Sequence, residues 1–256
     1  GNIGRKGVGV NPLRGQNNVQ GAADMGCQPH QGAGYFEVAD EKVQNFYTEK
    51  YGVVHPTKQG LKIPEMFDGA INKDVKAVWI IGEDIVQTDP NSAHVVQAMN
   101  SLELLVVQEI FMSETAKLAT VVLPGTTFLE KNGTFTNTER RIQRVNQAVP
   151  PLPGTKTDGM IVTDMMQKLG FDQPTYDADQ VLAEIADIVP FFKGVTRERL
   201  GKMGLQWPVQ EDGTDTQILH QETFKLGKGR LKNFDWKEST EIETNKKEYP
   251  LILTTS

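Results

Sequence analysis

The clearest pattern of hydrophobic positions lies in the middle of the chain, where apolar runs alternate with helical spacing. Residues 75–82 (VKAVWIIG) and 102–107 are two nearly continuous apolar runs, which is typical of strands buried on both faces. Between them, Asp89 and Pro90 supply an N-cap and a first-turn residue for a helix. A third apolar run follows at 120–124. This order predicts an α/β fold with a Rossmann-like, doubly wound, mainly parallel sheet flanked by helices.

Helical spacing also occurs on both sides of this central region. Residues 40–51 place an apolar side chain every three or four positions and end before a glycine, which predicts a helix with one buried stripe. Beyond the proline-rich linker at 150–154, one helix is expected to begin at Thr157 or Asp158 and another at Asp177. The sheet is therefore predicted to stand between helical segments.

Three further stretches have weaker patterns. The run Glu139-Arg140-Arg141 is typical of a solvated face, although paired arginines could also hold a phosphate. Residues 206–215 are interpreted as a loop, and residues 249–256 (YPLILTTS) as a buried strand without a return element. Because the chain also lacks an initiator Met, we expect it to be a segment of a larger multidomain subunit.

Composition narrows the possible partners of this 256-residue chain. Its net charge of −6 and the absence of a basic block argue against nucleic acid as a partner. No apolar run is long enough to span a bilayer, so we expect no direct membrane span and a cytoplasmic location. The single cysteine, Cys27, excludes an internal disulfide framework and is expected to be a buried small hydrophobic residue. The four histidines form no zinc motif, so no metal site is predicted.

The glycine-rich opening, residues 1–26, surrounds a single candidate for substrate binding, Arg14. Glycine lets the main chain approach a ligand closely, and Asn11-Pro12 predicts that Arg14 lies on a turn. A guanidinium can grip a carboxylate or phosphate at two points. This run contains neither the dinucleotide fingerprint nor a P-loop motif. From spacing alone, a surface turn carrying an ordinary solvated arginine is the favoured interpretation, because lone arginines on loops are common.

Polar residues follow all three predicted strands at their carboxyl ends. In open α/β sheets this edge is where ligands bind, so the three strand ends together predict a nucleotide-type site, with ordinary loop residues as the alternative. The residues concerned are Gly82, Glu83, Asp84, Gln108, Glu109 and Thr126.

Several runs in this order carry a resemblance to a known family. They are NPLRGQNNVQG at 11–21, GED at 82–84, VQEIF at 107–111, VLP at 122–124 and KTD at 156–158. Together they resemble the large catalytic subunit of molybdenum- or tungsten-dependent formate dehydrogenases, in the dimethyl sulfoxide reductase superfamily. The resemblance extends over nearly the whole chain, and the first run is the most specific.

The resemblance implies a bis-molybdopterin guanine dinucleotide cofactor with Mo or W, and oxidation of formate to CO₂ or the reverse. Arg14 would orient the substrate carboxylate beside the metal, and Gln16 would lie close to the pterin. The residues that would hold one guanosine arm are Gly82, Glu83, Asp84, Gln108, Glu109, Thr126 and Asp158. Acidic side chains suit the N1 and N2 donors of guanine and the ribose hydroxyls.

The resemblance also implies parts that this chain lacks. The cysteine or selenocysteine ligand of the metal, the [4Fe–4S] cluster and a terminal β domain would belong to the rest of the subunit, and an electron-transfer iron–sulfur subunit would be a partner. Related enzymes often have Trp at the position of Gly159, which puts stacking there in doubt. The implied units are an active-site loop with a helical segment (1–74), a Rossmann-like guanosine-binding domain (75–170), and a helical extension with a linker (171–256).

Two alternatives remain open from the sequence. The first is another molybdopterin oxidoreductase such as nitrate reductase, although such relatives generally lack an arginine at this loop position. The second is a pterin-less scaffold subunit of an NADH dehydrogenase-like complex. The segment by itself is expected to be inactive, because the metal ligand and the electron relay lie elsewhere.

Overall fold

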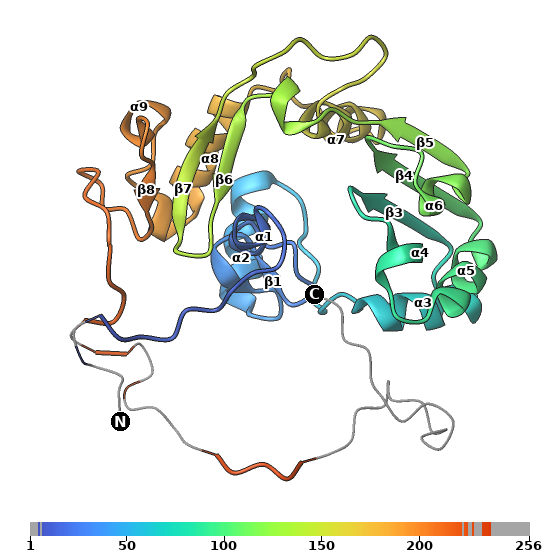
Figure 1. The fold of residues 1–256 in the computed structure, drawn as a ribbon, viewed down its shortest axis with the longest axis horizontal. Helices are drawn as coiled ribbons and strands as arrows, with labels where there is room; N and C mark the ends of the chain where they lie inside the picture. Colours follow the sequence, from blue (N-terminus) through green and yellow to red (C-terminus); the bar gives the residue numbers. More distant parts are fainter. Residues whose placement is uncertain (1–4, 6, 222, 225–226, 228–231, 237–256) are drawn as a thin grey trace.

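The structure of this protein is a computed structural model. The residues that it describes are 5, 7–221, 223–224, 227 and 232–236. Most of them form two units (Figure 1), each with its own three-stranded sheet and its own hydrophobic core, and a further two-stranded sheet lies in the N-terminal part. The predicted strand at 249–256 lies outside the described residues.

The first unit, here called the parallel unit, contains the predicted parallel sheet. Its strands pair in the order β3-β4-β5, and Val107 lies opposite both Ile80 and Val122. The prediction of an α/β fold with a parallel sheet flanked by helices is confirmed. The strands are β3 (Ala77–Ile81), β4 (Leu104–Glu109) and β5 (Val121–Pro124), and the helices are α3 (Ile63–Ile71), α4 (Ile85–Thr88), α5 (Ser92–Ser101) and α6 (Glu114–Lys117).

The core of the parallel unit joins its helices to the central strand. Val95 and Ala98 of α5 and Val107 of β4 are fully buried in one cluster that also contains Phe67 of α3. Burial of these apolar side chains removes them from water and provides the main driving force for assembling the unit. The continuous apolar character of β4 is explained by its central place in the sheet.

The start of helix α5 differs from the prediction. Asp89 and Pro90 do not begin it; the N-cap is Asn91, whose Oδ1 accepts a hydrogen bond of 3.2 Å from the His94 amide. The preceding residues form the additional short helix α4, and Asp89 is its C-cap. The helix is therefore capped by Asn91, which lies two positions after Asp89 and also has a side-chain oxygen that can accept from the first turn.

The second unit, here called the antiparallel unit, has the strand order β6-β7-β8. Its core includes Ile142, Val189 and Val195, which are nearly or fully buried. Residues 205–206 pair with β7, so the prediction of a loop from residue 206 is wrong at its start. The elements are η2 (Phe128–Glu130), which precedes the sheet, β6 (Gly133–Thr136), β7 (Arg141–Val145), α8 (Ala178–Ile188), η3 (Pro190–Phe192), α9 (Arg197–Leu200) and β8 (Leu205–Gln206).

The sequence predicts a solvated face for the run that contains Arg140, and for Arg140 this prediction is wrong. Its guanidinium donates hydrogen bonds to the carbonyl oxygens of Trp207, Thr216 and Gln217, and it lies 5.4 Å from the centre of the Trp207 ring. A guanidinium has five donors in a rigid fork, so one arginine can bind several carbonyl oxygens of the segment 207–217 at once. The partners lie 67 or more residues away, so local charge could not indicate them.

The N-terminal part of the chain contributes small elements next to the antiparallel unit (Figure 1). Helix α2 ends at Gly52 with φ 69°, as the sequence predicts, whereas helix α1 was not predicted. Cys27 is exposed, so the prediction of a buried residue is wrong; it stands in the turn after α1. The elements are α1 (Val19–Asp24), β1 (Gln31–Gly32), η1 (Ala33–Tyr35), β2 (Phe36–Glu37) and α2 (Glu41–Tyr51).

Helix α7 (Asp158–Lys168) follows the proline-rich linker, and its N-cap is Thr157. Just before it, Lys156 forms a parallel bridge with Gly125 and donates from its amide to Pro124 at 3.2 Å. The linker therefore brings the start of α7 to the carboxyl end of β5.

Candidate active site

The carboxyl-end edge of the parallel sheet brings most of the predicted cofactor residues together. Gly82, with φ +64°, follows β3 and donates from its amide to the carbonyl of Gln108 at 2.9 Å. The Gln108 side chain, 1% exposed, donates to Oδ1 of Asp158 at 2.7 Å. Gly125 donates to the Glu109 carbonyl at 3.0 Å and leads into Thr126. Residues from three strands and from α7 thus meet at one edge.

Two buried polar atoms at this edge have no partner among the described residues. They are Oε1 of Gln108 and Oγ1 of Thr126, in side chains that are 1% and 3% exposed. A buried acceptor without a donor costs roughly 1–3 kcal/mol, so such atoms are usually satisfied by a ligand or by water. The N–H and O–H groups of a guanosine match this acceptor-rich edge in chemical type. On this test the residues fit the nucleotide part of the cofactor that the sequence implies.

The acidic side chains at the edge have different surroundings. Oδ1 of Asp84 accepts from both the amide and the hydroxyl of Thr115, at 3.0 and 2.6 Å. Burial alone would raise the pKa of Asp84, but the hydrogen bonds from Thr115 outweigh it and lower that pKa below its ordinary value. Glu83 is exposed and accepts from the Thr88 hydroxyl at 2.6 Å, and Glu109 accepts from the amide of Ile110 at 2.7 Å. Asp84 therefore links the end of β3 to helix α6, in addition to any contact with a ligand.

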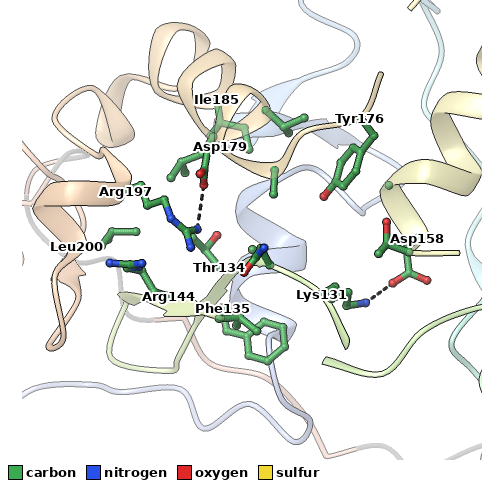
Figure 2. A pocket seen from close by; sticks show the side chains of 18 of the residues that line it. Lys131, Thr134, Phe135, Arg144, Asp158, Tyr176, Asp179, Ile185, Arg197 and Leu200 are labelled. Atoms are coloured by element: carbon green, nitrogen blue, oxygen red, sulfur yellow. Dashed lines mark hydrogen bonds and ion pairs between the residues drawn. The ribbon is translucent and has the colours of Figure 1, made fainter. Parts of the chain in front are cut away.

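Asp158 borders a cavity of 270 Å³ that was not predicted (Figure 2). Its second carboxylate oxygen forms an ion pair with Lys131, and the ring of Tyr176 lies beside it at the same end of the cavity. Arg144 and Arg197 line the other end, and Nε of Arg144 is buried without a partner among the described residues. The cavity therefore combines cations, a carboxylate and an aromatic ring.

Tyr176 explains the departure of this chain at Gly159. A Cβ atom at residue 159 would come within 2.1 Å of the Tyr176 ring. The glycine thus makes room for an aromatic side chain supplied by the segment before α8. The glycine at 159 was a sequence signal for this arrangement, whereas nothing in the local sequence indicated Lys131.

Arg14 and Gln16 lie in the loop before α1, and both are exposed. As predicted, Arg14 is not on a helix. Its Nε donates to Oε1 of Gln20 at 3.4 Å. No hydrogen bond among the described residues connects Arg14 or Gln16 to the sheet edge. The predicted site residues therefore fall into two groups, the edge and the loop.

A buried polar cluster behind Arg14 was missed by sequence reasoning. Asp24 is fully buried and accepts from Gln20, Tyr35 and Trp207 at 2.9, 2.7 and 2.9 Å. Burial raises the pKa of Asp24, while these hydrogen bonds and the charge of Arg14 act in the opposite direction. Burial and the adjacent Asp24 also raise the pKa of the Tyr35 hydroxyl. Residues 14–24 contain both Gln20 and Asp24, but the two other donors to Asp24, Tyr35 and Trp207, lie outside this run.

Within the described part of the chain, no group of three or more His, Cys, Asp and Glu side chains is placed to hold a metal ion. None of the helices in that part is long and apolar enough to cross a bilayer.

Relatives of this chain include alpha subunits of formate dehydrogenases. The chain is 44% identical to the alpha subunit of an F420-dependent formate dehydrogenase from Methanocaldococcus jannaschii, over 100% of this chain and 38% of the relative. It is 44% identical to the alpha subunit of F420-dependent formate dehydrogenase 1 from Methanococcus maripaludis, with the same coverage of 100% and 38%. A probable oxidoreductase of Bacillus subtilis, YjgC, is 43% identical over 94% of this chain and 25% of its own length. The chain thus spans less than half the length of these curated relatives.

Among solved structures, the acetylene hydratase of Pelobacter acetylenicus matches with a TM-score of 0.47 and 20% identity, over 61% of this chain and 22% of that one. The molybdopterin oxidoreductase family matches residues 1–168, which include the Arg14 loop and the whole sheet edge. The chain therefore belongs to the molybdopterin oxidoreductase family.

Proposed function

We propose that this chain is the central part of the catalytic subunit of a formate dehydrogenase. The observation that carries the proposal is the similarity of the whole chain, at 44% identity, to alpha subunits named as formate dehydrogenases. Arg14 supports it, because an exposed guanidinium with its terminal nitrogens available suits a small carboxylate. The complete subunit would oxidise formate to CO₂, or reduce CO₂ in the reverse direction.

Family membership implies a molybdopterin cofactor. We propose its finer identity as bis-molybdopterin guanine dinucleotide with Mo or W. The unpartnered Gln108 and Thr126 atoms at the sheet edge support binding of one guanosine arm there. Gly82, with no atom within 4 Å of a Cβ position, leaves room for a ligand against the main chain. The proposed contacts of the guanosine arm are Gly82, Glu83, Asp84, Gln108, Glu109, Thr126 and Asp158, with Gln16 next to the pterin.

The proposed reaction converts HCOO⁻ to CO₂, one proton and two electrons. The bound cofactor would supply the two-electron acceptor that amino acid side chains lack. In this scheme Arg14 binds the substrate carboxylate and offsets its charge, which orients the C–H bond for oxidation. The residues that take the proton and the [4Fe–4S] cluster that carries electrons onward would belong to the rest of the subunit.

We also propose the surroundings in which this segment works. The other domains of the same subunit would complete the active site, and an electron-transfer iron–sulfur subunit would receive the electrons. The guanosine-binding domain would lie within residues 75–170, between the active-site segment 1–74 and the extension 171–256. Its site would be on the parallel unit and the start of α7, since β6 and β7 of this range share a sheet with β8 of the extension. A cytoplasmic location completes the proposal.

The proposal is tested on the full-length subunit by metal analysis and by formate-dependent reduction of a dye. Mo or W together with formate turnover is expected, and the absence of both metals would refute the proposal. In the variant Arg14→Lys, metal content should stay at the wild-type level while turnover falls by at least tenfold, because lysine cannot make the two-point contact. Wild-type turnover in this variant would remove the role assigned to Arg14.

A further inference from the structure

We infer that Gln20 and Asp24 are positioning residues that hold the guanidinium of Arg14 so that its terminal nitrogens face a carboxylate ligand. The inference rests on the proposed function of Arg14 and extends it to two side chains behind it. It follows from the buried polar cluster that contains Gln20, Asp24, Tyr35 and Trp207.

Asp24 is the fixed point of this cluster. Its side chain is fully buried, and donors from three separate parts of the chain reach it. Gln20 and Tyr35 donate to Oδ1 at 2.9 and 2.7 Å, and the indole N–H of Trp207 donates to Oδ2 at 2.9 Å. Trp207 is 183 residues away in the sequence. An indole N–H can only donate, so it holds this oxygen as an acceptor, and the carboxyl group cannot rotate without losing several bonds.

The acceptor character of Asp24 decides the orientation of the Gln20 amide. The Gln20 Nε2 group faces Oδ1 of Asp24 and also the Tyr35 hydroxyl, both at 2.9 Å. Tyr35 gives its own hydrogen to Asp24, so its oxygen is free to accept from Gln20. Such a network, rather than the shape of the amide, determines which end is oxygen. With its NH₂ group bound on this side, Gln20 turns its carbonyl oxygen towards Arg14.

The carbonyl of Gln20 then engages one edge of the Arg14 guanidinium. The bond to Nε is 3.4 Å long, and Gln20 is the one hydrogen-bond partner of Arg14 among the described residues. A guanidinium held at Nε still presents its two terminal nitrogens, which are a matched pair for the two oxygens of a carboxylate. The length of the bond indicates a modest contribution.

The base of this arrangement is itself held in place. Gln20 lies on α1, and Asn18 at the N-cap accepts a 2.9 Å hydrogen bond from the amide of Thr136 in β6. Gly21 permits this contact, because a Cβ there would come within 2.2 Å of Oδ1 of Asn18. The position of Gln20 is therefore fixed relative to the antiparallel sheet, and its hydrogen bond to Arg14 places the guanidinium relative to the same sheet.

The test uses the full-length subunit and the variants Gln20→Met and Asp24→Asn. Methionine keeps the length of the side chain but removes the acceptor for Arg14, and asparagine removes the charge that orients the Gln20 amide. In both variants the KM for formate should rise roughly three- to tenfold with kcat within about twofold, as expected for loss of one hydrogen bond that acts on binding. Metal content should be unchanged.

The matched control is Tyr35→Phe. This variant also loses buried hydrogen bonds of the same cluster, but the bond between Gln20 and Asp24 remains and still orients the amide. Its KM should stay within about twofold of the wild type. If Tyr35→Phe raised the KM as much as Asp24→Asn, the cluster would only stabilise the fold and the inference would be wrong.

A second measurement needs no turnover. Acetate is a carboxylate without the formate hydrogen, and its binding can be followed by how well it protects Arg14 from phenylglyoxal, with modification quantified by peptide mass spectrometry. The acetate concentration for half-protection should rise roughly three- to tenfold in Gln20→Met and Asp24→Asn but not in Tyr35→Phe. Equal half-protection in the wild type and both variants would overturn the inference. A wild-type subunit that binds acetate in this way but does not oxidise formate would refute only the proposed function.

Discussion

Replacing Asp84 by Asn should loosen the parallel sheet near helix α6 as well as affect any ligand at the edge. In the wild type, one carboxylate oxygen accepts two hydrogen bonds, from the amide of Thr115 at 3.0 Å and from its hydroxyl at 2.6 Å. Thr115 is fully buried, so its donors have no access to water. Asparagine can keep an oxygen in the same place but removes the negative charge, so both hydrogen bonds weaken rather than vanish.

The size of the effect follows from the two bonds. A hydrogen bond to a charged group is worth about 1 kcal/mol more than a neutral one. Asp84 is only partly buried, so water screens part of this difference, and about 1–2 kcal/mol is expected for the pair. At about 1.4 kcal/mol for each factor of ten, local opening should become roughly 5- to 30-fold more frequent.

Hydrogen–deuterium exchange of the full-length subunit measures this local opening. Faster exchange is expected in peptides covering residues 104–124, which contain β4, α6 and β5. Glu83→Gln is the matched control, because it also removes an acidic charge at the edge, but from an exposed side chain that is bound only to the Thr88 hydroxyl. The reasoning would be refuted if Asp84→Asn exchanged at the wild-type rate in residues 104–124. It would also be refuted if Glu83→Gln accelerated exchange there as much as Asp84→Asn does.

The effect of Asp84→Asn on hydrogen exchange should depend on pH. Hydrogen bonds from Thr115 outweigh burial and lower the pKa of Asp84 below its ordinary value of 3.8. A lowered pKa means that the stabilisation by Asp84 is fully present above pH 3.8 and is lost as the pH falls through the folded-state pKa. The difference in exchange between wild type and Asp84→Asn should therefore be constant near neutral pH and shrink in acid.

Three further variants test other parts of the structure. Gly194→Ala should destabilise the antiparallel unit by about 3 kcal/mol, seen as faster exchange there, because the new Cβ would lie 1.7 Å from the carbonyl oxygen of Gln210. In the cofactor-free subunit, Thr126→Val should leave stability equal or higher by about 1 kcal/mol, since it removes an unpaired hydroxyl, whereas in the loaded subunit it should lower the amount of guanine nucleotide that is released on denaturation. Gly159→Ala should displace the Tyr176 ring and quicken exchange around residue 176 without changing exchange at 104–124.

Much of the fold could be predicted from local sequence. The end of α2 at Gly52 and the N-cap Asp177 were identified correctly, and the start of α7 was narrowed to Thr157 or Asp158, because each depends on residues within one turn of the helix. The parallel sheet was also predicted, because strands covered on both faces must be apolar throughout. Where the local signal was ambiguous, as at the start of α5, the tertiary structure selected Asn91 in place of Asp89.

Sequence by itself also determined that polar groups would gather at the carboxyl edge of the sheet and that Arg14 would lie on a loop. Only the tertiary structure decided which of these groups have partners. Gln108 meets Asp158 across 50 residues, and Asp24 meets Trp207 across 183. Helical and strand periodicity act over a few residues, whereas a buried polar group must find its partner wherever the fold brings one. For this reason the loop that carries Arg14 could be predicted, but the side chains behind it could not.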